Sequence, residues 1–209
     1  ESGREGLIVL LTTFDPARGV VPEQEIKVSD IISQARSLDT QLLLVPLPAS
    51  CNYVATLDSA LRYLCKEFAV DLSTSQATDE QVGLRSEKSS RAEDAYHRNV
   101  RLTFGDLHLK DIRQWRQAEL GEKLGWVLDF PLFEREYASL QEILWASKAT
   151  ARISAVTAKG QSAVHVGQIF DRTLVEKLQQ EGCIDAFGEN GEFHTLVTFE
   201  DMNFFDSAY

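Results

Sequence analysis

The sequence predicts an α/β fold, a doubly wound parallel sheet with a C-terminal α/β extension. Continuous apolar runs alternate along the chain with stretches in which apolar residues recur at helical spacing. The links between them are short, as in parallel sheets whose strands are joined by helical crossovers. With 209 residues, 44% of them hydrophobic and 25% charged, the chain has the composition of a globular protein with a core.

The first four expected elements set this pattern. The apolar run 7–14 ends in Asp-Pro and predicts a strand buried on both faces. Apolar residues at helical spacing predict a helix over 28–38, and the run 41–46 predicts a second strand closed by a proline. A further helical stripe covers 57–68, with Thr56 as its expected N-cap.

The segment 73–99 interrupts the alternation. It is rich in Ser, Glu, Arg, Gln and Asp and has few apolar anchors, which predicts a polar surface insertion with at most one helix, in its second half.

The alternation then resumes up to the end of the chain. The pattern Thr173-Leu-Val-Glu176 is a capping box, and the helix that it opens is expected to stop at Gly182. We expect residues 1–130 to form a nucleotide-binding domain and residues 131–209 a substrate-side domain. The other elements expected here are strands at 100–104, 126–133, 152–158 and 196–199, and helices around 111–118 and over 137–147.

Charge and motif content exclude several classes of protein. The net charge of −11 argues against nonspecific binding to nucleic acid or to an anionic membrane. No apolar run is long enough to span a bilayer, and no signal-peptide pattern opens the sequence. The three cysteines lack CxxC spacing, which indicates a reducing compartment, so we expect a cytoplasmic protein. GxSxG, Walker A and GxGxxG motifs are absent from the sequence.

The densest group of chemically active side chains is the run 188–195. It holds two carboxylates, an amide, an imidazole and a hydroxyl between glycines, which allow close approach of a ligand to the backbone. Neighbouring acids on a turn can orient a metal ion, an amine or a water molecule. The alternative to a binding site is a polar hairpin or the polar start of a strand, which accounts for the same residues. The candidates are Gly188, Glu189, Asn190, Gly191, Glu192, His194 and Thr195.

Two further groups follow expected strands. Ligands of open parallel sheets bind beyond the carboxyl ends of the strands, so we expect Thr12-Thr13-Phe14 and Gly105-Asp106 to meet at one rim. Arg113 and Arg116 share one face of the following helix and are candidates for an anionic ligand, or for a solvated surface. The four histidines lack ligand spacing, so no dedicated metal site is expected. A Mg²⁺ ion carried by the substrate and held partly by Asp106 or Glu192 is the more plausible metal.

These motifs resemble one known family. Phe104-Gly-Asp-Leu-His-Leu-Lys-Asp-Ile-Arg113, Pro131-Leu-Phe133 and Gly188-Glu-Asn-Gly-Glu-Phe-His-Thr-Leu-Val197 together resemble the diphthine–ammonia ligases. These are ATP pyrophosphatases with a Rossmann-like, adenine nucleotide alpha hydrolase-like fold. The resemblance covers nearly all of the chain except 73–99. It implies an ATP-dependent ligase that adenylates a carboxylate with loss of pyrophosphate, after which ammonia displaces AMP. The acceptor it implies is diphthine on elongation factor 2.

The resemblance also implies roles for the candidate residues. Thr12, Thr13 and Phe14 would contact the adenosine of ATP, and Gly105 and Asp106 would close the nucleotide rim. Arg113 would neutralise the α-phosphate or the carboxylate substrate. Glu189 and Glu192 would position ammonium, accept a proton or help to hold Mg²⁺. Asn190 and His194 would orient the acyl-adenylate, with Gly188, Gly191 and Thr195 on the substrate side.

One element of the family pattern is missing from the sequence. The pyrophosphate-binding loop Ser-Gly-Gly-Lys-Asp-Ser is expected before Glu1, and residues 1–5 resemble the end of the helix that follows it. We therefore expect the chain to be a fragment that hydrolyses ATP poorly by itself. The alternative is a degenerate, non-catalytic nucleotide-binding or interaction subunit of the same fold.

Overall fold

The computed structural model describes residues 7–74 and 100–200. The chain divides into two compact units. Unit 1 comprises Glu1–Cys51 and Arg135–Tyr209, and unit 2 comprises Asn52–Glu134. The functional division expected at residue 130 stays a prediction.

Unit 1 opens with a parallel strand pair. Strand β1 (Val9–Phe14) pairs with β4 (Gln41–Pro46) from Val9 opposite Gln41 to Phe14 opposite Pro46, and α1 (Val28–Ser37) connects them. The expected strand–helix–strand unit is thus confirmed. The sequence pattern did not predict the hairpin of β2 (Val20–Val21) and β3 (Ile26–Lys27), whose strands are too short to show a period.

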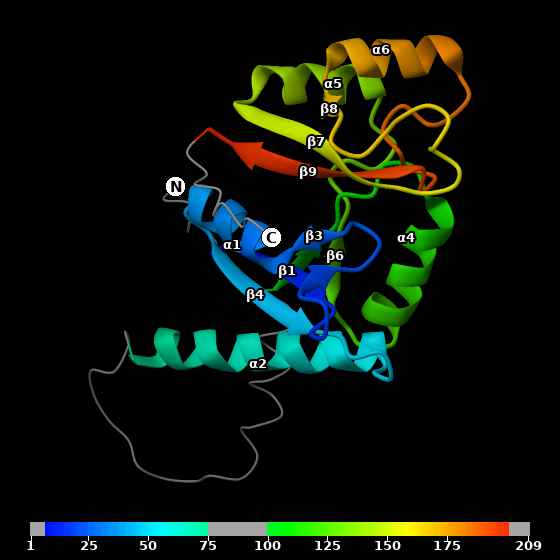
Figure 1. The fold of residues 1–209 in the computed structure, drawn as a ribbon. Coiled ribbons are helices and arrows are strands. Elements are labelled where there is room, and N and C mark those ends of the chain that lie inside the picture. The colour runs from blue at the N-terminus through cyan, green and yellow to red at the C-terminus, as the bar shows by residue number, and fades with distance from the viewer. Residues whose placement is uncertain (1–6, 75–99, 201–209) are drawn as a thin grey trace, which may run out of the picture. The chain divides into compact units, whose positions relative to one another are not determined.

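The rest of unit 1 is an antiparallel sheet with the order β8-β7-β9. Its strands are β7 (Ala149–Val156), β8 (Ile169–Phe170) and β9 (Phe193–Phe199), and α5 (Tyr137–Ala146) and α6 (Arg172–Glu181) lie along one face (Figure 1). Side chains alternate along β9, so that Phe193 and Val197 pack with the α6 core. Leu196 faces the other way and packs with the hairpin and α1.

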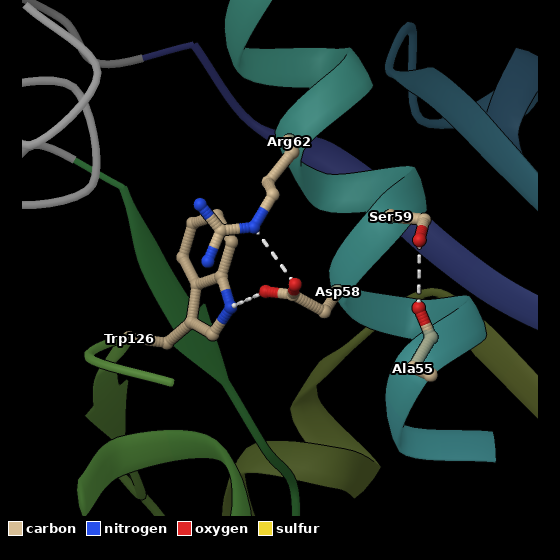
Figure 2. A network of polar contacts seen from close by, with 5 residues as sticks. All are labelled: Ala55, Asp58, Ser59, Arg62 and Trp126. Atoms are coloured by element: carbon tan, nitrogen blue, oxygen red, sulfur yellow. Dashed lines mark hydrogen bonds and ion pairs between the residues drawn. The ribbon is translucent and has the colours of Figure 1, made fainter. Parts of the chain in front are cut away.

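Unit 2 contains a second parallel pair. Strand β5 (Arg101–Thr103) pairs with β6 (Val127–Asp129), and α4 (Lys110–Arg116) with the π-helix Gln117–Glu122 connects them. The long helix α2 (Tyr53–Thr74) belongs to the same unit. One carboxylate joins α2 to the residue before β6. Asp58 accepts a hydrogen bond from Trp126 Nε1 at 2.9 Å and one from Arg62 Nε at 2.7 Å (Figure 2).

Two helix starts differ from the prediction. Asn52, not Thr56, caps α2, because its Oδ1 accepts the amide of Ala55. Asp171, not Thr173, caps α6, because its Oδ1 accepts the amide of Leu174 at 2.9 Å. In both cases a stronger capping residue stands earlier in the chain, and the helix begins there. Gly182 ends α6 in the left-handed conformation, as predicted.

The fold class is confirmed at the level of a mixed α/β fold with parallel strand pairs. A single doubly wound sheet is not confirmed, since the described strands form separate pairs and an antiparallel sheet. The expected strand over 126–133 shrinks to β6, because Phe130–Phe133 turns back with Phe133 N bonded to Phe130 O. Helix α2 continues to Thr74, and the remainder of the expected insertion, 75–99, lies outside the described residues. None of the described helices is long and apolar enough to cross a membrane.

Candidate functional site

The acid-rich loop, residues 185–192, leads directly into β9. Gly188 and Gly191 have φ values of 74° and 75°, in the left-handed region that favours glycine. A Cβ on Gly188 would lie 2.8 Å from the carbonyl oxygen of Phe193. The predicted run of candidates therefore forms a tight turn, with Phe193, His194 and Thr195 already in the strand.

Asp185 organises this loop. Its Oδ1 accepts the amides of Phe187 at 2.8 Å and Glu189 at 3.1 Å, and its Oδ2 accepts the hydroxyl of Tyr137 at 2.6 Å. Its own amide donates to Glu192 Oε1 at 3.0 Å. These five residues are called the Asp185 network below. The sequence reasoning missed Asp185 and Tyr137. An Asp three residues before a glycine is a typical turn signal and could have identified Asp185. No local pattern identifies Tyr137.

Glu192 is a buried carboxylate with one oxygen uncommitted. The residue is only 4% exposed. Besides the amide of Asp185, Oε1 receives Asn190 Nδ2 at 3.5 Å, the long limit of a hydrogen bond. Oε2 is buried and has no hydrogen-bond partner among the described residues. Burying a carboxylate oxygen without a donor costs free energy, so folding alone does not favour this arrangement.

The carboxylates of this loop act on the pKa of the Tyr137 hydroxyl. Burial is the main reason that the pKa of its hydroxyl is raised far above the ordinary range. The hydrogen bond to Asp185 adds to the shift, and so do the charges of Asp185, Glu189 and Glu192. Three carboxylates therefore act on one phenol. Because the Asp185 and Glu189 amides stabilise acceptors within the loop, backbone dipoles partly offset this concentration of charge.

The turn after β7 supports the loop from one side. Thr157 Oγ1 donates to Gly191 O at 2.7 Å, and the Thr157 amide donates to Glu192 O at 3.0 Å. Lys159 Nζ donates to the carbonyl of Asn190 at 2.9 Å. Gly160 packs so closely that a Cβ there would lie 2.4 Å from Glu192 O.

His194 lies on β9 outside the Asp185 network. No hydrogen bond joins it to that network in the described part of the chain. Burial lowers the pKa of its imidazole, and the charge of Glu23 partly offsets this shift. Glu23 stands in the turn of the β2–β3 hairpin with a φ of 64°. Opposite His194, β7 carries a bulge between Ile153 and Ala155, a feature that often re-aims side chains near sites.

Unit 2 holds a second, basic group, the guanidinium–phenyl cluster. The Arg113 guanidinium carbon lies 4.2 Å from the ring centre of Phe133 and 5.2 Å from that of Phe130. The Arg116 guanidinium lies 4.2 Å from Phe104, whose ring stacks on Phe130. Phe104 and Phe130 directly follow the parallel strands β5 and β6, where ligands of such strand pairs bind.

The two arginines of the cluster differ in their ion pairs. Arg116 Nε lies 3.0 Å from Asp106 Oδ2, and Nη2 donates to Oδ1 at 3.3 Å. No ion pair with Arg113 is seen within the described residues, and its Nε is buried without a hydrogen-bond partner. Asp106 is thus engaged by Arg116, whereas Arg113 keeps its charge available. Nothing within 4 Å would obstruct a Cβ on Gly105, so its surroundings are open.

The predicted nucleotide residues are divided between the units. Thr12, Thr13 and Phe14 end β1 in unit 1 and are half-buried. Gly105, Asp106 and Arg113 belong to unit 2. The shared rim therefore stays a prediction, as do the assigned roles. In residues 7–74 and 100–200, no group of three or more His, Cys, Asp or Glu side chains is arranged to hold a metal ion.

Comparison with known proteins assigns the part of unit 1 that carries the acid-rich loop. Residues 138–206 match the family described as the diphthamide synthase C-terminal domain. This region is diphthamide synthase-like. The match confirms the resemblance inferred from the motifs for about a third of the chain, and it begins directly after Tyr137. A search of the curated proteins found no match.

Proposed function

We propose that the protein takes part in diphthamide biosynthesis or in a closely related ATP-dependent amidation. In this reaction a carboxylate is adenylated with release of pyrophosphate, and ammonia then displaces AMP. The observation that carries the proposal is the diphthamide synthase-like region, within which Glu192 is buried with an uncommitted carboxylate oxygen. A doubly wound, Rossmann-like nucleotide domain is part of the proposal.

Residues of this chain suit both steps of the reaction, the adenylation and the attack of ammonia. Adenylation builds negative charge at the α-phosphate, and Arg113, held by phenyl rings and without an ion pair in the described chain, suits the neutralising role. The second step needs a group that accepts a proton as ammonia attacks. The carboxylates of Glu189 and Glu192 suit this role. The Glu192 carboxylate is held by the amide of Asp185, and the backbone of Glu189 is held by its own amide, which donates to Asp185.

The cofactors of the proposal are ATP and Mg²⁺, both implied by the resemblance. Because Asp106 is engaged by Arg116 and the described acids form no metal-binding group, the residues do not fit a protein-held Mg²⁺ ion. ATP, ammonia and a protein-borne carboxylate, diphthine on elongation factor 2, are the proposed reactants, in the cytoplasm.

The direct test follows the nucleotide product. The protein at its natural length is incubated with ATP, Mg²⁺, ¹⁵N-ammonium and elongation factor 2 carrying diphthine. We expect AMP and pyrophosphate in equal amounts and ¹⁵N in the acceptor amide. R113A should reduce the rate at least about tenfold, the loss expected for one charge-stabilising group, whereas R101A, at an exposed position, should not. Release of ADP, or AMP without ¹⁵N incorporation, would overturn the proposal.

A further inference from the structure

Tyr137 is a half-buried phenol to which the proposed reaction assigns no role. Its hydroxyl donates to Asp185 Oδ2 at 2.6 Å, across 48 residues of sequence. The centre of its ring lies 4.5 Å from that of Phe187. Burial, followed by the hydrogen bond to Asp185 and the charges of the loop acids, raises the pKa of the hydroxyl far above its ordinary range. The hydroxyl therefore stays protonated, and a hydrogen-bond donor, throughout the neutral pH range.

Asp185 links this phenol to the carboxylate of Glu192. Its two oxygens have separate partners, because Oδ2 accepts the Tyr137 hydroxyl and Oδ1 accepts the amides of Phe187 and Glu189. An aspartate oxygen that accepts the amide two residues further on closes a turn. The amide of Asp185 itself donates to Glu192 Oε1 at 3.0 Å. The Tyr137 hydroxyl thus holds the side chain that closes the turn, and the turn holds the amide that orients the Glu192 carboxylate.

We propose that Tyr137 is a positioning residue for the second step of the proposed reaction, and that it acts through Asp185 on the Glu192 carboxylate. The proposal rests on the proposed function for the identity of the step, and on the geometry for the chain of contacts. In that step the nitrogen of ammonia bonds to the acyl carbon, and the bond between this carbon and the oxygen of AMP breaks. The proton lost by the nitrogen goes to a carboxylate of the loop.

The contact should affect the attack of ammonia and leave adenylation unchanged. Arg113, the residue proposed for adenylation, lies in unit 2 and is not a member of the Asp185 network. A displacement of about 1 Å in a group that takes part in a reaction can lower the rate about 100-fold. Tyr137 is two contacts away from the Glu192 carboxylate, so loss of its hydroxyl should have a smaller effect, about tenfold on this step alone.

Three variants separate the hydroxyl from the ring. Y137F removes the donor to Asp185 and keeps the ring beside Phe187. F187L removes the facing ring, whereas the backbone amide that donates to Asp185 stays. Y63F makes the same chemical change as Y137F at a tyrosine that is 61% exposed. A merely structural role predicts that Y137F and F187L affect both steps in parallel with stability. A positioning role predicts that Y137F alone changes the ratio of the two steps.

The two steps are measured separately on the protein at its natural length. Exchange of labelled pyrophosphate into ATP, with elongation factor 2 carrying diphthine and without ammonium, reports adenylation. Formation of AMP in a single turnover, after ammonium is added, reports the second step. Y137F should slow the second step about tenfold and leave the exchange within about twofold, whereas F187L and Y63F should keep the ratio of the unaltered protein. Equal losses in both steps, or an unchanged ratio in folded Y137F, would overturn the proposal.

Proton exchange tests the chain of contacts without any reaction. In NMR spectra of the unaltered protein, the hydroxyl proton of Tyr137 should exchange with water at least about tenfold more slowly than that of Tyr63. In Y137F, the amides of Phe187 and Glu189 should exchange faster than in the unaltered protein, because their acceptor is held less firmly. If Y137F does not fold, the comparison of the two hydroxyl protons still decides.

The outcome is distinguishable from the fate of the proposed function. A slowly exchanging Tyr137 hydroxyl and faster amide exchange in Y137F, combined with no pyrophosphate exchange in the unaltered protein, support the positioning of Glu192 and contradict the ligase. Release of AMP with ¹⁵N incorporation, combined with a Tyr137 hydroxyl that exchanges as fast as that of Tyr63, supports the ligase and contradicts the positioning role.

Discussion

The acid-rich loop and the guanidinium–phenyl cluster gather opposite charges by opposite means. In the loop, backbone amides and one phenol donate to carboxylates, so that Asp185 alone takes part in four of the contacts described above. In the cluster, guanidinium groups lie against phenyl rings, and Arg116 also forms an ion pair with Asp106. Hydrogen bonds fix atoms in direction, whereas ring faces hold a cation with less directional restraint. The loop should therefore tolerate substitution far less than the cluster.

The largest effect is expected at the centre of the loop. D185A leaves the Tyr137 hydroxyl and the amides of Phe187 and Glu189 without their acceptor, at a cost of about 3 kcal/mol in the free energy of unfolding. Urea denaturation followed by ¹⁹F NMR of fluorotryptophan measures this, since Trp145 belongs to unit 1 and Trp126 to unit 2. The shift should occur at Trp145. An unchanged midpoint there would show that the network does not stabilise the loop.

The next largest effect comes from packing. G160A places a methyl group 2.4 Å from Glu192 O and 3.2 Å from Val156 Cγ1, so the turn after β7 must move away from the loop. We expect a loss of about 2 kcal/mol in the free energy of unfolding, measured in the same way. G105A is the matched control, because nothing lies within 4 Å of its added methyl group. Equal stability of the two variants would contradict the close packing.

The acid-rich loop and the residues that contact it show which features can be predicted from the sequence and which cannot. The strands and helices around the loop were predicted because apolar periodicity is local, as was the stop at Gly182. The run 188–195 stood out by its own composition. Tyr137 and Gly160 matter only because the chain returns to them, Tyr137 from 48 residues away in the sequence. No local pattern carries such information.

The helix caps and the antiparallel sheet also show what local sequence patterns cannot predict. Thr173 and Thr56 matched capping patterns, yet Asp171 and Asn52 begin the helices because competing caps nearby were stronger. Whether β9 pairs parallel or antiparallel could not be predicted from the local sequence either. Apolar alternation does not distinguish a parallel from an antiparallel partner, and β9 pairs antiparallel with β7.

A smaller effect is expected at the ion pair of the cluster. Asp106 and Arg116 are 15% and 20% exposed, so their pairing is screened in part by water. D106N should cost about 1 kcal/mol in the free energy of unfolding, observed at Trp126 rather than Trp145. D58N, in the network that joins α2 to Trp126, provides a reference within the same unit. A loss as large as that of D185A would remove the distinction between the two regions.

The cluster should tolerate a change of cation still better. R113K keeps the positive charge and loses the flat contact with Phe130 and Phe133, at a cost of about 0.5 kcal/mol in stability. If Arg113 binds the nucleotide as proposed, R113K should nevertheless lower ATP affinity several-fold, measured by calorimetry. Loss of stability without loss of affinity would assign Arg113 to packing.

The smallest effect concerns pH and the strand that leaves the loop. Burial lowers the pKa of His194 below its ordinary value of about 6.5. As pH falls through 6.5 the unfolded chain takes up the proton first, so the stabilising contribution is complete above that value. It is then lost as pH falls toward the lowered pKa of the folded state. H194N should remove this part of the pH dependence, whereas H165N, at an exposed position, should not.

E23Q removes the charge that raises the His194 pKa, so the pKa should fall further in imidazole NMR titrations. An unchanged titration in E23Q would show that the hairpin turn does not act on β9.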